Sequence, residues 1–68
     1  MQQGEDREHI LIVEDDAPIR KFMASALTSG GYEVSEAESG KQAFARLRNQ
    51  VHDLVLLDLK LEDVDGME

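Results

Sequence analysis

The sequence predicts an α/β domain with a three-stranded parallel sheet in the order 2-1-3 and two helices. Three short apolar runs alternate with two stretches whose apolar residues recur at helical spacing, and strands that alternate with helices form parallel sheets with right-handed crossovers. The first and third runs are apolar throughout, as in strands buried on both faces. The middle run alternates, so it belongs at an edge, and the order 2-1-3 leaves the third strand bare on one side.

The first predicted strand is HILIV, residues 9–13, which follows a polar lead-in, residues 1–8, that we expect to be disordered. Asp16 can cap the helix after this strand, and Pro18 suits the first helical turn. Apolar residues then recur on one helical face that we expect to join the core: Ile19, Phe22, Met23, Ala26 and Leu27.

Two glycines, residues 30–31, end this helix and lead into the second predicted strand, YEVSEA, residues 32–37. Ser39 can cap the second helix. That helix has a smaller apolar face, which is made by Ala43, Phe44 and Leu47, and we interpret Phe44 as a core residue. The third predicted strand is DLVLLD, residues 53–58, which ends in an acidic residue.

The composition favours a soluble cytoplasmic protein of one small domain. The chain has 68 residues, a net charge of -8 and no cysteine, which excludes disulfides and thiolate zinc sites. The acidic balance argues against direct binding of nucleic acid or of an anionic membrane. No apolar run approaches the roughly 18 residues that span a bilayer, and the polar N-terminus is unlike a signal peptide.

Acidic residues follow two strands that the predicted order makes neighbours. Glu14, Asp15 and Asp16 come after the first strand, and Asp58 closes the third. Adjacent parallel strands lie about 4.8 Å apart and end at the same edge of the sheet, where open α/β sheets bind ligands. Clustered carboxylates repel one another unless a cation lies between them, and oxygen ligands of this kind suit Mg²⁺. A carboxylate beside such a metal can attack phosphorus and form an aspartyl phosphate.

Other polar residues are interpreted without a chemical role. His9 and His52 flank predicted strands at the end of the sheet opposite the acids, and we interpret them as boundary residues rather than metal ligands. Lys21, Arg46 and Arg48 are interpreted as residues on solvated helix faces.

Three stretches together resemble the N-terminal half of a bacterial response-regulator receiver domain. They are ILIVEDDAPIRKFM, YEVSEAESGKQAFARL and DLVLLDLKLEDVDGME. The resemblance covers residues 9–68 and rests on the acidic pair after the first strand, the Asp that closes the third strand, and the Asp-Gly seven residues after that Asp. It implies a truncated receiver with the flavodoxin-like fold, whose strand order begins 2-1-3.

The resemblance also implies a role for each acidic residue. Asp58 resembles the phosphoacceptor. Glu14 and Asp15 resemble the acidic pair that holds Mg²⁺, Asp15 directly and Glu14 through water, with the backbone carbonyl of Lys60 as the remaining ligand. The Lys60 side chain occupies a position that tunes how long the phosphoryl group survives. Glu62 stands where most members of the family have proline.

The implied function is to accept a phosphoryl group from a histidine kinase or a phosphotransfer protein in two-component signalling. Such a protein is a phosphoacceptor rather than an enzyme. After Asp58 the chain has no Ser or Thr, and its one Lys is Lys60. A complete receiver supplies a hydroxyl and a lysine there, so we expect truncation to impair phosphoryl transfer.

Two alternatives remain open at this point. The chain could be a non-catalytic module that self-associates or docks on a kinase, or an excised fragment with no independent role. The bare side of the third strand favours a homodimer through that strand, or the exchange of an element between chains, because an exposed apolar strand edge is a template for another chain.

Overall fold

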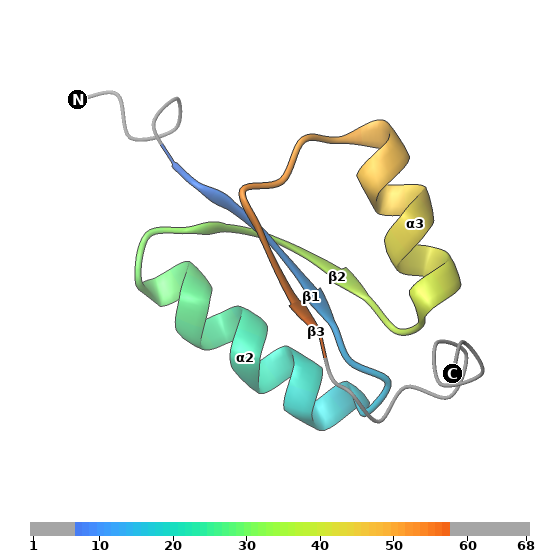
Figure 1. The fold of residues 1–68 in the computed structure, drawn as a ribbon. Coiled ribbons are helices and arrows are strands. Elements are labelled where there is room, and N and C mark those ends of the chain that lie inside the picture. The colour runs from blue at the N-terminus through green and yellow to red at the C-terminus, as the bar shows by residue number, and fades with distance from the viewer. Residues whose placement is uncertain (1–6, 58–68) are drawn as a thin grey trace.

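The computed structural model describes residues 7–57, which form a sheet with a helix on each side (Figure 1). Along the chain the elements are β1 (His9–Val13), α2 (Ala17–Ser29), β2 (Glu33–Ala37), α3 (Gly40–Asn49) and β3 (Leu54–Leu57). The expected disordered lead-in, residues 1–8, lies mostly outside the described residues. Asp58, Lys60 and Glu62 lie outside them entirely.

The central strand of the sheet is β1, in the order β2-β1-β3. Both of its pairings are parallel, and Ile10 stands opposite Val34 on one side and Leu54 on the other. The predicted fold class and strand order are therefore confirmed. Burial on both faces explains the fully apolar sequence of β1, since residues 10–13 are each at most 4% exposed.

The core has two halves, one on each face of the sheet, because successive residues of a strand point to opposite faces. One half is made by Ile10, Ile12 and Ala24, with Met23, Leu27, Val34 and Leu56 packed against it. The other half is made by Leu11, Val13, Ala37 and Ala43. Helix α2 therefore covers the first face and α3 the second.

The ends of both helices follow the sequence prediction. The Asp16 side chain accepts the backbone N–H of Ile19 at 3.1 Å, and the Ser39 hydroxyl accepts that of Gln42 at 3.1 Å. After α2, Gly31 adopts a φ of 98°, a conformation that favours glycine. Neither helix of this described part has the length and apolar character needed to cross a bilayer.

The apolar face predicted for the first helix is only partly buried. Phe22 is 74% exposed and Ile19 is 48% exposed, whereas Ala24, which is absent from the predicted face, is 9% exposed and packs on the sheet. Phe44 of α3 is 59% exposed. The prediction that both phenylalanines belong to the core is therefore wrong. In residues 7–57 the sheet ends at β3, which leaves these side chains without a further strand beneath them.

Candidate functional site

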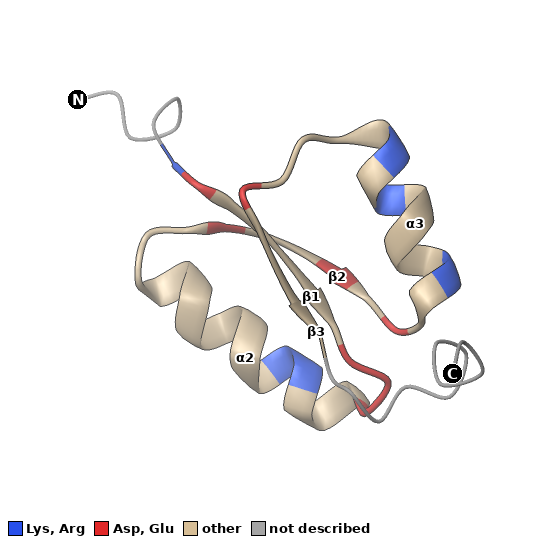
Figure 2. Cartoon of the chain, viewed as in Figure 1, with Lys and Arg blue, Asp and Glu red and all other residues tan. Residues whose placement is uncertain are grey.

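The three acids that follow β1 lie at the carboxyl end of the sheet, and they differ in exposure (Figure 2). Glu14 is 6% exposed, and its backbone N–H donates to the oxygen of Ala37 at 3.0 Å. Its Oε2 accepts the backbone N–H of Asp16 at 3.1 Å, which orients the carboxylate. Asp15 is exposed to solvent.

The third acid, Asp16, is used by the helix. Besides capping Ile19 with its side chain, it accepts the N–H of Arg20 with its backbone oxygen at 2.9 Å. The prediction that Asp16 is a helix cap is confirmed. A carboxylate oxygen engaged in a cap is a poor candidate for metal binding, because binding there would remove the bond that starts the helix.

The end of β3 lies beside this acidic segment. Val13 stands opposite Leu57 in the parallel register, so the chain leaves both strands at the same end of the sheet. Asp58 follows Leu57 in the sequence, but Asp58 and Lys60 lie outside the described residues. Within residues 7–57, no three His, Asp or Glu side chains are grouped in a way that could hold a metal ion. The Mg²⁺ site therefore stays a prediction.

Arg20 of α2 connects the acidic segment to β2, a role that was not predicted from the sequence. Its side chain is 11% exposed. Nη1 donates to the backbone oxygen of Glu14 at 2.9 Å, and Nε donates to Oε1 of Glu36 at 3.1 Å. A sign was present in the sequence: Arg20 precedes Ala24 by four residues, so the two share the face of the helix that meets the sheet.

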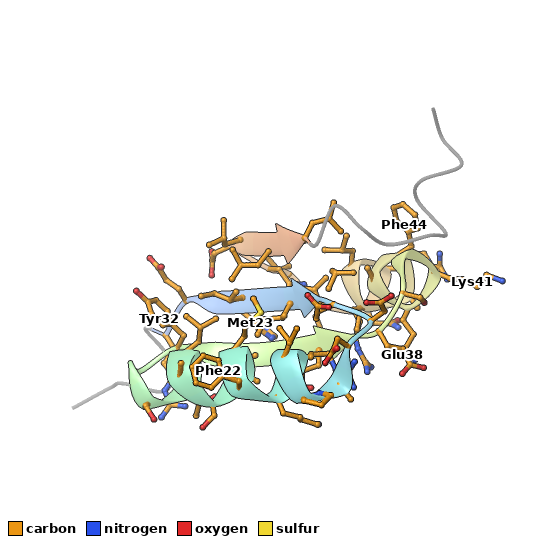
Figure 3. All side chains as sticks on the ribbon, turned by 90° about the horizontal axis from the view of Figure 1, so that it is seen from below. Phe22, Met23, Tyr32, Glu38, Lys41 and Phe44 are labelled. Atoms are coloured by element: carbon orange, nitrogen blue, oxygen red, sulfur yellow. The ribbon has the colours of Figure 1, made fainter. Side chains whose placement is uncertain are left out.

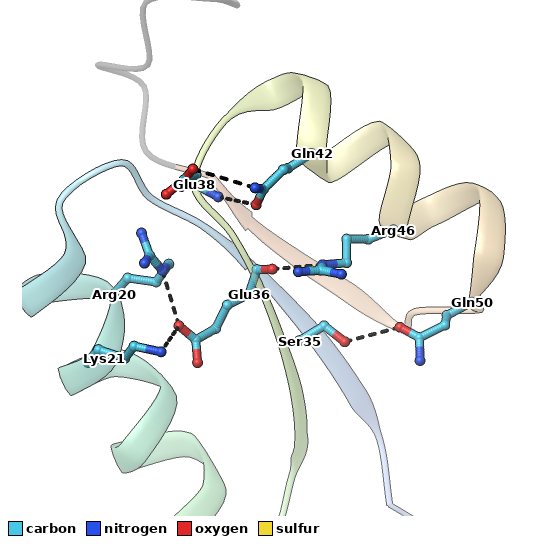
Figure 4. Close-up of a pocket in the computed structure, with 8 residues that line it drawn as sticks. All are labelled: Arg20, Lys21, Ser35, Glu36, Glu38, Gln42, Arg46 and Gln50. Atoms are coloured by element: carbon cyan, nitrogen blue, oxygen red, sulfur yellow. Dashed lines mark hydrogen bonds and ion pairs between the residues drawn. The ribbon is translucent and has the colours of Figure 1, made fainter.

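Glu36 on β2 is the centre of a small ion-pair network (Figure 4). Its Oε1 forms ion pairs with Nε of Arg20 at 3.1 Å and with Nζ of Lys21 at 3.2 Å. Burial raises the pKa of Glu36, but hydrogen bonds from Lys21 and Arg20, together with their positive charges, outweigh burial and leave the pKa below its usual 4.5. Lys21 is largely solvated, as predicted, but it also has this partner.

Side chains of α3 cover the free edge of β2. The Nε of Arg46 donates to the backbone oxygen of Glu36 at 2.8 Å, and Oε1 of Gln42 accepts the backbone N–H of Glu38 at 3.0 Å (Figure 4). An added strand would need these same backbone groups. The contacts lie along an open groove of about 530 Å³ between α2 and α3, which only polar and charged residues line.

The free edge of β3 has no such cover among residues 7–57. Leu54, Val55 and Leu57 are 50%, 40% and 47% exposed. Large apolar side chains on both helices are exposed as well, namely Ile19, Phe22, Phe44 and Leu47. Figure 3 shows Phe22 and Phe44 projecting outward from their helices.

Each helix separates its polar contacts from its exposed apolar residues. Lys21 reaches Glu36 on β2, and Ile19, two residues earlier, lies about 200° around the axis of α2 from Lys21. On α3, Gln42 bonds Glu38, the residue after β2, and Phe44 lies about 200° around the axis from Gln42. The described unit therefore has one polar, covered edge at β2 and one apolar, uncovered edge at β3.

Comparison with known proteins gives a consistent result. The sequence pattern that describes the response regulator receiver domain matches residues 10–68. The phosphate regulon transcriptional regulatory protein PhoB of Pseudomonas aeruginosa is 49% identical over 59 residues, which are 87% of this chain and 26% of that protein. The response regulator receiver protein CpdR of Brucella abortus is 36% identical over 61 residues, 90% of this chain and 51% of that protein.

A sensor protein is also similar. The CAI-1 autoinducer sensor kinase/phosphatase CqsS of Vibrio cholerae is 37% identical over 68 residues, which are 100% of this chain and 10% of that protein. The chain thus spans from a tenth to about half of the length of these relatives. No solved structure gives a significant match.

Proposed function

Because the chain belongs to the response regulator receiver family, we propose that it accepts a phosphoryl group at Asp58 from a histidine kinase or a phosphotransfer protein. The observation that carries this proposal is the match over residues 10–68, which includes Asp58 and both acids of the pair, Glu14 and Asp15. The parallel register supports it, since it brings the acidic segment and the end of β3 to the same end of the sheet.

The proposed transfer needs little covalent chemistry from the protein. A carboxylate oxygen of Asp58 attacks phosphorus as the bond from phosphorus to the donor's imidazole nitrogen breaks, and the electron pair of that bond stays on the imidazole. Asp58 is consumed as an acceptor, so the chain is a substrate of phosphotransfer rather than an enzyme. The contribution of the fold is to hold the loop after β1 in place, which Arg20 does by bonding Glu14 and Glu36.

The donor set fits Mg²⁺, because it consists of carboxylate and carbonyl oxygens. We assign the ion to Glu14, Asp15, Asp58 and the backbone carbonyl of Lys60. When bound, Mg²⁺ would neutralise charge on the phosphoryl oxygens. The hydrogen bond from Asp16 holds the Glu14 carboxylate in one orientation, and the exposure of Asp15 leaves its carboxylate accessible to an ion.

The test is labelling of the purified 68-residue chain with acetyl phosphate, with and without Mg²⁺, followed by intact mass. We expect Mg²⁺-dependent gain of one phosphoryl group, lost in Asp58→Asn and kept in Asp63→Asn, an acid of the same segment with no assigned role. Labelling should be slower than that of a complete receiver run in parallel, because this chain supplies no hydroxyl or second lysine after Asp58. Equal labelling of Asp58→Asn, or none in the wild-type chain, would reject the proposal.

A second candidate function is self-association, which the difference between the two sheet edges favours. Arg46 and Gln42 occupy backbone groups on the β2 edge, whereas Leu54, Val55 and Leu57 leave the β3 edge apolar and accessible. A homodimer in which two β3 strands pair about a two-fold axis perpendicular to the sheet would be antiparallel at its centre. Exchange of an element between chains is the nearest alternative arrangement.

A further inference from the structure

The two histidines contact each other at the end of the sheet opposite the acidic segment. His9 is the first residue of β1, and His52 lies two residues before β3 begins. Their ring centroids are 4.2 Å apart, with the planes inclined by 46°. The interpretation of both as boundary residues is therefore incomplete, because the pair connects the start of β1 to the segment just before β3.

His9 is held in place by polar contacts on several sides. Its Nε2 lies 2.8 Å from the hydroxyl of Ser35, and that hydroxyl donates to Oε1 of Gln50 at 3.1 Å. Because the hydroxyl has one hydrogen and gives it to Gln50, Nε2 of His9 is the donor to Ser35. The backbone of His9 also donates to Oδ2 of Asp53 at 2.8 Å and accepts the N–H of Asp53 at 2.7 Å.

His52 has a different environment. Both of its ring nitrogens are buried and make no well-formed hydrogen bond among residues 7–57, although the backbone of Gln50 lies close enough to interact with the ring. Burial lowers the pKa of His52, and the adjacent His9 lowers it further, while the Gln50 backbone and the charge of Asp53 act in the opposite direction and do not compensate. The other polar side chains of this cluster, Ser35 of β2 and Gln50 after α3, are uncharged. The ring thus fits this place in its neutral form.

We propose that the contact between His9 and His52 is a pH-sensitive latch that holds the start of β3 against β1. In the neutral state the two rings pack together. A proton on His52 would place a positive charge on ring nitrogens that solvent does not reach and directly against His9, and the Gln50 backbone and Asp53 do not offset this cost, so protonation disfavours the packed position of the ring. The backbone pairing between Asp53 and His9, directly after His52, is the part of the sheet that displacement of the ring loosens.

The direction of the pH effect follows from proton linkage. His52 binds a proton less readily in the folded chain than at its usual pKa of 6.5 in an unfolded chain. Below pH 6.5 the unfolded or opened state therefore takes up more protons than the closed state, and acidification favours opening. The latch is fully closed above pH 6.5 and opens as the pH falls from there through the lowered pKa of His52.

The test is NMR on the full 68-residue chain across this pH range. The ring protons of His52 should titrate below 6.5. The amide exchange of Val55 and Leu57, whose N–H groups point to β1 as that of Asp53 does, should rise several-fold as His52 is protonated, after correction for the intrinsic effect of pH. The amide of Ala37 on β2, which also points to β1 but lies at the other end of the sheet from the histidine pair, should change much less.

Replacing His52 with an apolar ring that cannot bind a proton distinguishes the effect of protonation from the effect of ring packing. In His52→Phe the pH dependence of Val55 exchange should disappear, while His9→Gln should retain it, because His52 still titrates there. The proposal is overturned if His52 titrates at or above 6.5, or if β3 exchange is indifferent to its protonation. Should His52→Phe fail to fold, these two measurements on the wild-type chain decide the question. The test does not involve Asp58 phosphorylation, so either proposal can fail alone.

Discussion

At the scale of residues, the structure separates three consecutive acids into different roles. Glu14 is buried and oriented by a backbone N–H, Asp15 is exposed, and Asp16 caps α2. The sequence predicted the cap because Asp is a preferred N-cap residue ahead of a proline-containing first turn. It could not indicate that Glu14 would be buried, since that depends on the bond from its backbone to Ala37 on a neighbouring strand.

This separation predicts opposite behaviour of two neighbouring variants. Asp16→Ala should lower the free energy of unfolding by about 0.5–2 kcal/mol, because it removes a helix cap. Asp15→Ala should leave stability nearly unchanged, because the side chain is exposed, but should reduce Mg²⁺-dependent labelling of Asp58. Urea unfolding and intact mass measure the two effects on the same samples.

The matched pair also supplies its own control. Asp16→Asn should retain most of the stability, since Asn caps helices as well as Asp does. A large loss of stability in Asp15→Ala, with labelling intact, would show that the two roles have been assigned the wrong way round.

At the scale of elements, α2 ends in a turn of two glycines that differ in backbone conformation. Gly30 has a φ of -81°, which any residue adopts, whereas Gly31 has a φ of 98°. The N–H of Gly31 donates to the oxygen of Thr28 at 3.0 Å, and that of Tyr32 to the oxygen of Leu27 at 3.2 Å. The turn therefore closes the helix and directs the chain into β2.

Gly31→Ala should destabilise the chain by about 1–2 kcal/mol, the cost of a side chain in a left-handed conformation. Among residues 7–57, no atom outside Gly31 and its two chain neighbours lies within 4 Å of a Cβ added at Gly31, so the expected loss comes from backbone strain and not from a clash. Gly30→Ala is the control and should have a much smaller effect, as its nearest contact would be the oxygen of Leu27 at 3.4 Å. Equal losses in thermal unfolding would contradict the assignment of strain to Gly31.

The elements also show which features of the fold could be predicted from the sequence and which could not. Strand positions and both caps followed from periodicity and capping residues, because these depend on local geometry, whereas the strand order rested partly on the family resemblance. The exposure of Phe22 and Phe44 did not follow, because helical spacing shows that residues share a face but not whether a strand lies beneath that face. The contact of His9 with His52 joins residues 43 positions apart, and no local pattern contains it. The assignments of Asp58 and Lys60 remain predictions.

At the scale of the whole molecule, the two edges of the sheet predict a closed dimer and not a filament. A sheet with two accessible edges can add chains without limit, whereas a sheet with one covered edge stops after a single pairing. Arg46 and Gln42 provide that cover at β2. The proposed two-fold axis would also place the two acidic segments at opposite ends of a six-stranded sheet, which limits repulsion between chains that each carry a net charge of -8.

The dimer prediction is tested by light scattering across a dilution series. We expect a mass of two chains that falls to one on dilution, and a dimer that tightens as salt is raised, because salt screens the repulsion between acidic chains. Val55→Lys should shift the equilibrium to monomer, since it places a charge on the pairing edge. Ser25→Lys adds the same charge on an exposed position of α2 and should leave the dimer intact. A folded wild-type monomer at micromolar concentration, with the amides of β3 exchanging freely, would show that the apolar edge is tolerated in water and that strand composition does not require a partner there.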